Sequence, residues 1–135
     1  MSTFTTPLEV EVLDDGRHYR LLREFDFASS VLQRIIRVPA GFVTDFASIP
    51  RVLWTLIPPT GRYSKASVLH DDAYQHPEMV APPITRLQAD RLLLEGMDAL
   101  ATGRLTRWCV FIGIRLGGWI VWNNYRQRKR RAPHV

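Results

Sequence analysis

The spacing of hydrophobic and polar residues separates a first third with a strand period from a remainder with a helix period. Residues 8–13 (LEVEVL) alternate apolar and polar side chains, which is typical of a half-buried strand. The turn signal Asp14-Asp15-Gly16 follows, and residues 17–22 complete a predicted hairpin. The other segments predicted in this part are strands at 31–38 and 42–44, with an irregular link at 24–30.

Three helices are predicted in the remainder of the chain. The first has Ser64 as its N-cap and is stopped by Pro77. The tetrapeptide Thr85-Arg86-Leu87-Gln88 has the form of a capping box, which places the second helix at about 85–101. The third spans about 104–127. The expected fold is therefore α+β, with a small N-terminal antiparallel sheet packed against about three C-terminal helices.

The third predicted helix has an unusual surface. It is apolar on every side from Trp108 to Trp122, except at Arg115. This run is shorter than the ~20 residues that cross a bilayer, so no membrane span is expected. A helix of this kind is buried within its domain or covered by a partner, and the sequence leaves both open. If it is buried, Arg115 should pair with a carboxylate, either Asp45 or Asp90.

Composition and charge narrow the choice of partners. A chain of 135 residues is expected to form one domain, here assigned to 1–125, followed by a basic tail at 126–135 that carries five basic residues. The net charge of +5 is concentrated in this tail rather than on a face, so nucleic-acid binding is not favoured. The tail is either a solvated terminus or a contact for anionic lipid, nucleic acid or an acidic protein.

Two further features concern the compartment in which the chain works. The first residues lack the basic start and apolar run of a signal peptide, so synthesis in the cytoplasm is expected. The single cysteine, Cys109, excludes an internal disulfide. Because it lies in the apolar run, we expect a buried, inert thiol.

Candidate chemistry lies on the first two predicted helices. His70 shares a helix face with the apolar Leu69 and Ala73, and Asp90 shares one with Leu93 and other apolar residues. Burying either polar group without a partner costs about 1–3 kcal/mol, so the two side chains are expected to meet. A carboxylate on one imidazole nitrogen leaves the other nitrogen as a base for water. The alternative is a buried pair that only fixes helix packing.

Two more carboxylates are candidate cation ligands. Asp71 lies off the apolar stripe and is expected at a groove edge. Asp45 follows a predicted strand end, where functional groups often lie, although it could instead cap a helical turn.

The order of several motifs resembles a small domain family of unknown function that is common in tailed phages and prophages. The resemblance covers about residues 35–122. The matching residues are VPAGFVTDFASIPR at 38–51, GRYSKASVLHD at 61–71, Tyr74, Ala89-Asp90, Arg115, Gly118 and Trp122. It implies a phage origin and brings no established activity.

A shorter motif, HDDAY at 70–74 with Ala89-Asp90, resembles the core of secreted phospholipase A-two, especially its viral capsid forms. The resemblance implies that His70 activates water and that Asp71 binds calcium. It also implies that Asp90 orients His70 and that Tyr74 bonds to Asp90. The glycine-rich calcium loop of that family is not reproduced, because residues 58–62 (PPTGR) have one glycine.

These observations lead to two main competing functions, with the binding of a host factor after infection as a third. The first is a phage-derived hydrolase at the cell envelope, with His70, Asp90 and Tyr74 as catalytic residues and calcium on Asp71 and Asp45. The second is a non-catalytic virion component, such as a tail or baseplate protein, or an assembly factor. Its helix at 104–127 would bind other phage structural proteins or a second copy, and an anionic membrane surface is a further candidate partner. In either case we expect synthesis in the host cytoplasm, with assembly into the virion in the second.

Overall fold

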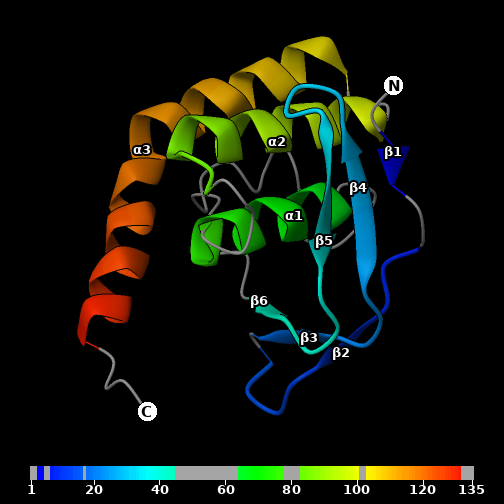
Figure 1. The fold of residues 1–135 in the computed structure, drawn as a ribbon, viewed down its shortest axis with the longest axis vertical. Coiled ribbons are helices and arrows are strands. Elements are labelled where there is room, and N and C mark those ends of the chain that lie inside the picture. Colours follow the sequence, from blue (N-terminus) through cyan, green and yellow to red (C-terminus); the bar gives the residue numbers. More distant parts are fainter. Residues whose placement is uncertain are drawn as a thin grey trace.

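The computed structural model describes residues 3–4, 7–16, 18–44, 64–77, 83–100 and 103–131, with side chains up to Lys129. The fold is α+β, as predicted: short antiparallel strands in two sheets are followed by three helices (Figure 1). The strands are β1 (Thr3–Phe4), β2 (Val10–Val12), β3 (Tyr19–Leu21), β4 (Phe25–Ser29), β5 (Arg34–Val38) and β6 (Val43–Thr44). The helices are α1 (Ser64–Gln75), α2 (Arg86–Ala99) and α3 (Arg104–Arg131).

One sheet has the order β2-β3-β6 and contains the predicted hairpin. Val10 pairs with Leu21 and Val12 with Tyr19, so the hairpin forms where the alternating pattern predicts it. Gly16 in the connecting turn has a φ of 69°, a left-handed conformation that glycine adopts at no steric cost. The hairpin is therefore fixed by the local sequence.

The other sheet has the order β1-β4-β5 and corrects two predictions. The segment 24–30 is not an irregular link, because Phe25–Ser29 forms β4 with Phe25, Phe27 and Ser29 buried. The strand predicted at 31–38 begins only at Arg34, since residues 30–33 form the turn between β4 and β5. Gln33 has a φ of 55° in this turn, which is uncommon for a residue other than glycine and is not predicted by the local sequence.

The helices begin close to where the capping signals place them. The Thr85 side chain accepts a hydrogen bond from the Gln88 backbone N–H, and the Gln88 side chain accepts one from Thr85 N at 2.8 Å. This capping box is the one predicted, and α2 starts directly after it. α1 ends at Gln75, two residues before Pro77.

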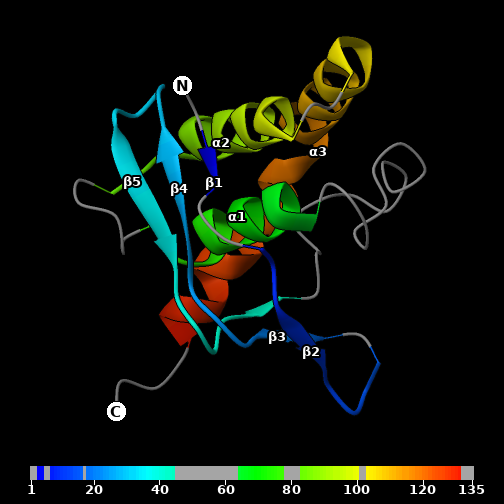
Figure 2. The ribbon, with the colours of Figure 1, turned by 90° about the vertical axis from the view of Figure 1, so that its right-hand side faces the viewer.

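The elements stack in three layers. In Figure 2 the β1-β4-β5 sheet lies on one side, α1 and α2 form the middle, the first half of α3 lies on the far side of α2, and its second half passes behind α1. The core joins all three layers. Its fully buried members include Phe25 and Phe27 of the sheet, Leu69 and Tyr74 of α1, Leu93 and Met97 of α2, and Val110 and Ile114 of α3. The middle layer is the most enclosed, and it carries the candidate polar residues.

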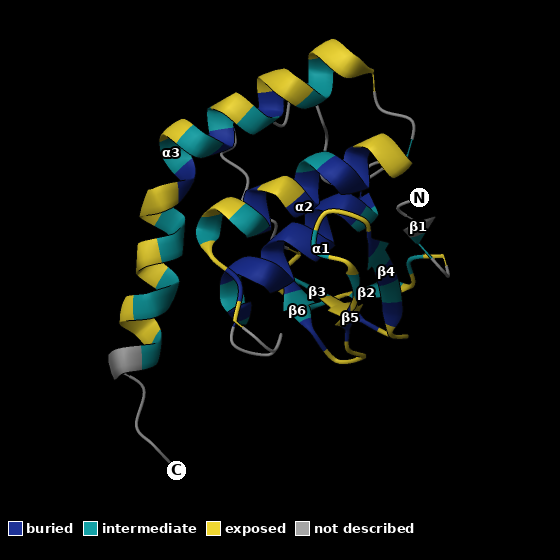
Figure 3. Cartoon of the chain, turned by 45° about the horizontal axis from the view of Figure 1, so that its top comes forward, coloured by how far each residue is buried: buried dark blue, intermediate teal, exposed yellow. Residues whose placement is uncertain are grey.

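α3 is bent and is only partly buried. Its first half runs along α2 and its second half turns down past α1 (Figure 1). Gly113, Gly117 and Gly118 lie in its middle, and paired glycines are a common cause of helix bending. Figure 3 shows exposed residues along its outer edge and buried ones toward the body.

This arrangement corrects two expectations about α3 and confirms a third. Cys109 is exposed rather than buried, because the helix is covered on one side only. The helix also runs on to Arg131, so the described basic residues Arg126, Arg128 and Lys129 belong to it rather than to a free tail. Among the described helices none is long and apolar enough to cross a bilayer, as predicted.

Candidate functional site

α1 supplies most of the candidate site, and its burial is more complete than its apolar stripe predicts. The predicted face, which includes Leu69, His70 and Tyr74, is fully buried. Asp71 on the adjacent face is also fully buried, so the expectation that it lies at a groove edge is wrong. The helix passes through the middle layer, where α2, α3 and the strands enclose it from several sides.

The predicted contact between His70 and Asp90 is present. His70 Nε2 donates a hydrogen bond to Asp90 Oδ1 at 2.9 Å, and the Tyr74 hydroxyl donates to the same oxygen at 2.5 Å. The other oxygen, Oδ2, accepts from Arg115 Nη1 at 2.8 Å, which is one of the two pairings expected for Arg115. Arg86 Nη1 approaches Oδ2 at 3.4 Å. Asp90 thus joins α1, α2 and α3 at one point.

These contacts set the protonation of the cluster. Burial raises the pKa of Asp90, but the hydrogen bonds from His70, Tyr74 and Arg115 outweigh it and hold this pKa below its ordinary value of 3.8. Burial and the neighbouring Asp90 charge raise the pKa of Tyr74 above its ordinary value. Asp90 is therefore the ionised acceptor of the cluster and Tyr74 a neutral donor.

Asp71 forms a second buried cluster. It accepts hydrogen bonds from the hydroxyl of Thr44 in β6, from Gln75 Nε2 at 2.9 Å and from the Tyr125 hydroxyl at 3.1 Å. Calcium takes 6–8 oxygen ligands, whereas the neighbours of Asp71 are hydrogen-bond donors that already occupy both of its oxygens. Within the described ranges no three acidic, histidine or cysteine side chains are grouped to hold a metal. The described surroundings of Asp71 therefore do not fit a calcium site. Asp45, the other predicted ligand, lies outside the described residues.

The second half of α3 covers both clusters. The Trp122 ring meets the Tyr74 ring edge to face, with 5.2 Å between centroids. Arg126 Nη2 donates to the carbonyls of Tyr74 at 2.5 Å and Gln75 at 3.0 Å, which caps the end of α1. A Cβ added at Gly118 would lie 2.6 Å from the Tyr74 hydroxyl, so α3 approaches α1 this closely because residue 118 is glycine. As a result His70 is 0 % exposed.

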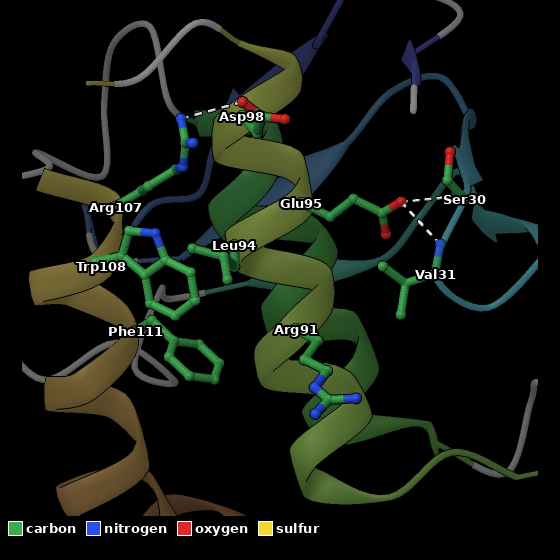
Figure 4. A pocket seen from close by; sticks show the side chains of 9 residues that line it. All are labelled: Ser30, Val31, Arg91, Leu94, Glu95, Asp98, Arg107, Trp108 and Phe111. Atoms are coloured by element: carbon green, nitrogen blue, oxygen red, sulfur yellow. Dashed lines mark hydrogen bonds and ion pairs between the residues drawn. The ribbon is translucent and has the colours of Figure 1, made fainter. Parts of the chain in front are cut away.

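Two surface hollows formed by described residues lie elsewhere. Figure 4 shows an open groove of about 730 Å³ whose floor is the outer side of α2. Trp108 and Phe111 point into it from α3 toward Leu94, and Arg107 pairs with Asp98 at 3.0 Å at one end (Figure 4). A second hollow lies beside Phe42 and His76. Neither is lined by His70, Asp71 or Asp90.

Several residues of the two clusters were not predicted from the sequence. Arg86 lies one helical turn before Asp90, a spacing that typically brings a cation and a carboxylate together, so its contact was readable. Thr44 and Tyr125 carry no comparable signal, because their contacts depend on how β6 and α3 cross α1.

Comparisons with known proteins support the expectation that the chain belongs to an uncharacterised family. No curated protein matches the chain. No solved structure matches it either. The family described as "Protein of unknown function (DUF1353)" matches residues 19–114, which include β3 to β6, α1, α2 and the start of α3 as far as Ile114. His70, Asp71, Tyr74 and Asp90 all fall within the match, and the chain therefore belongs to the DUF1353 family.

Proposed function

We propose that the protein is a non-catalytic docking component of a phage-type particle, with the outer side of α3 as its docking surface. The observation that carries this proposal is a row of exposed apolar residues on α3. We call this row the outer stripe, which consists of Leu105, Cys109, Ile112, Leu116, Trp119 and Ile120. Side chains of this kind are normally buried, and a contiguous exposed set is typical of an interaction site.

The burial of the polar clusters supports a structural role for them. A catalytic base must reach its substrate or a water molecule, whereas His70, Asp71 and Asp90 are each 0 % exposed. Their hydrogen bonds join the three helices and β6, and this rigid body would present α3 in a fixed orientation. The particle context rests on the phage resemblance described above. The protein would be made in the host cytoplasm and then assembled.

The test compares incorporation of matched variants into purified particles. The triple variant Ile112→Glu, Leu116→Glu, Ile120→Glu disrupts the outer stripe. Ile35→Glu is the control, since Ile35 is 66 % exposed on β5, in the layer opposite α3. Mass spectrometry of particles is expected to find the native and control proteins and to miss the triple variant. Absence of the native protein, or equal incorporation of all three, would contradict the proposal.

A second candidate function, hydrolysis at the cell envelope, is favoured by one specific observation. Asp90 Oδ1 accepts hydrogen bonds from both His70 and Tyr74, as the resemblance to phospholipase A-two implies. The native protein would be assayed on phospholipid vesicles with and without calcium, beside His70→Gln and the control Asp98→Asn. If the native protein hydrolyses phospholipid and only a folded His70→Gln variant loses this activity, the docking proposal is wrong and the protein is a hydrolase. The docking proposal predicts no hydrolysis in any condition.

A further inference from the structure

The outer stripe lies on the convex side of a bent helix. Its central members, Ile112, Leu116 and Ile120, are 56 %, 75 % and 50 % exposed. Trp119 is half exposed beside them, whereas Trp108 turns away into the groove of Figure 4 and rests against Phe111. The body fills the concave side of α3, and exposed positions follow its outer edge (Figure 3). The exposed apolar residues of the outer stripe therefore form a ridge on this side.

The charge of α3 has one sign. The helix contains eight basic residues and no acidic residue. Four of the described basic side chains are engaged with the body: Arg107 with Asp98, Arg115 with Asp90, Arg126 with carbonyls of α1, and Lys129 with His76. Arg104 at the start of the helix and Arg128 near its end are exposed, so one exposed cation lies toward each end of the ridge.

The shape and charge of α3 together indicate which partner binds the outer stripe. Pairing with a second copy would bring two helices with eight basic residues each into contact, and like charges at close range oppose it. A convex ridge also offers no groove for a partner's side chains. An anionic bilayer accepts an apolar ridge without a matching pocket and attracts the flanking cations, at about 1 kcal/mol for each Lys or Arg near the surface.

We propose that the outer stripe first docks α3 on the surface of an anionic phospholipid bilayer and that incorporation into the particle depends on this step; the inference rests on the docking surface proposed above. Leu116 and Ile120 enter the acyl region, and Trp119 lies at the headgroup boundary, where its amphipathic ring is favoured. Arg104 and Arg128 lie at the headgroups. The middle of the bent helix lies along the interface, and its ends turn away from the acyl region.

The test measures co-sedimentation with vesicles of phosphatidylglycerol and phosphatidylcholine in equal parts, and with vesicles of phosphatidylcholine alone. The native protein and Ile35→Glu are expected to bind the anionic vesicles and to be released by high salt. Leu116→Glu is expected to lower the partition coefficient about tenfold, and the triple variant further still. Because these side chains are exposed, the variants should keep the native circular dichroism and urea midpoint. Leu116→Glu alone serves if the triple variant does not fold.

The outcomes separate this proposal from the docking function. If the native protein fails to bind, binds neutral vesicles equally well, or binds unchanged after the triple substitution, the bilayer proposal is overturned. Loss of particle incorporation in the triple variant without vesicle binding would leave the docking function standing, with an acidic protein as the partner. Vesicle binding without any effect of the stripe on particles would instead remove the particle function.

Discussion

Asp90 organises the polar interior of the protein at the scale of single residues. Its two oxygens accept hydrogen bonds from His70, Tyr74, Arg115 and Arg86, and the carboxylate is completely buried. The helices could pack on apolar contacts alone, but only one arrangement places all these donors on one acceptor. Asp90 therefore contributes to the uniqueness of the packing as well as to its stability.

Replacement of Asp90 by alanine should be strongly destabilising. It leaves several buried or half-buried donors without their acceptor, and breaking a buried ion pair in this way costs about 3–5 kcal/mol. The control is Asp98→Ala, which removes a solvent-exposed partner of Arg107 and should cost less than about 1 kcal/mol. Urea unfolding of both variants measures the difference. Equal midpoints would show that the Asp90 cluster adds nothing to stability.

The same carboxylate predicts how stability depends on pH. The pKa of Asp90 is lowered in the folded state, because the donated hydrogen bonds outweigh the effect of burial. Its contribution is thus complete above pH ~4 and is lost as the pH falls toward the lower folded pKa, since the unfolded chain takes up the proton first. Asp90→Asn should flatten the acid limb of a plot of unfolding free energy against pH. Parallel acid limbs would contradict the assignment.

At the scale of elements, one glycine determines how closely α3 packs on α1. Gly118 places the α3 backbone against the Tyr74 hydroxyl, and that hydroxyl is itself held by Asp90. The Tyr74 side chain cannot move away from residue 118 without losing its hydrogen bond to Asp90, because its ring is confined between His70 and Trp122.

Gly118→Ala should therefore destabilise the protein by about 1–3 kcal/mol, the usual cost of overpacking, despite the better helix propensity of alanine. Gly103→Ala is a matched control, since nothing lies within 4 Å of an added Cβ there. Thermal unfolding compares the two. A Gly118→Ala protein as stable as the native one would show that α3 and α1 can separate without cost.

The elements also show what a sequence pattern can and cannot predict. The capping box at Thr85 and the alternation around the hairpin are local, so α2 and the β2–β3 pair were predictable. The His70–Asp90 contact was also predictable, because each side chain lies on an apolar helix face and needs a partner. Cys109 was misjudged because a helix that is apolar on every side does not reveal which side is covered. β1 was missed because two residues carry no period.

At the scale of the whole molecule, α3 has two distinct sides. Its inner side seals the polar clusters through Trp122, Tyr125 and Arg126, and its outer side bears the stripe. A single helix therefore couples the enclosure of His70 to the surface proposed for docking.

A shortened chain tests how far α3 protects the middle layer. Ending the chain at Val121 removes Trp122, Tyr125 and Arg126, whereas ending it at Arg126 keeps all three. Amide exchange in α1 should be tenfold or more faster in the first form than in the second, because a hydrogen bond to a charged group contributes about 1.5–3 kcal/mol. Hydrogen exchange with mass spectrometry measures this. Equal protection of α1 in both would show that the second half of α3 is not needed for enclosure.

The pairing of Thr3 and Phe4 with β4 has a practical consequence for handling the protein. Phe4 lies opposite Phe27 in the ladder, and its ring centroid is 4.6 Å from that of Phe27, so these two residues occupy the free edge of the sheet. Proteolytic trimming of the first six residues would uncover the unpaired amides and carbonyls of β4 together with an aromatic patch. Open strand edges of this kind template pairing between chains, so trimmed preparations should form oligomers or precipitate on storage, and intact ones should not.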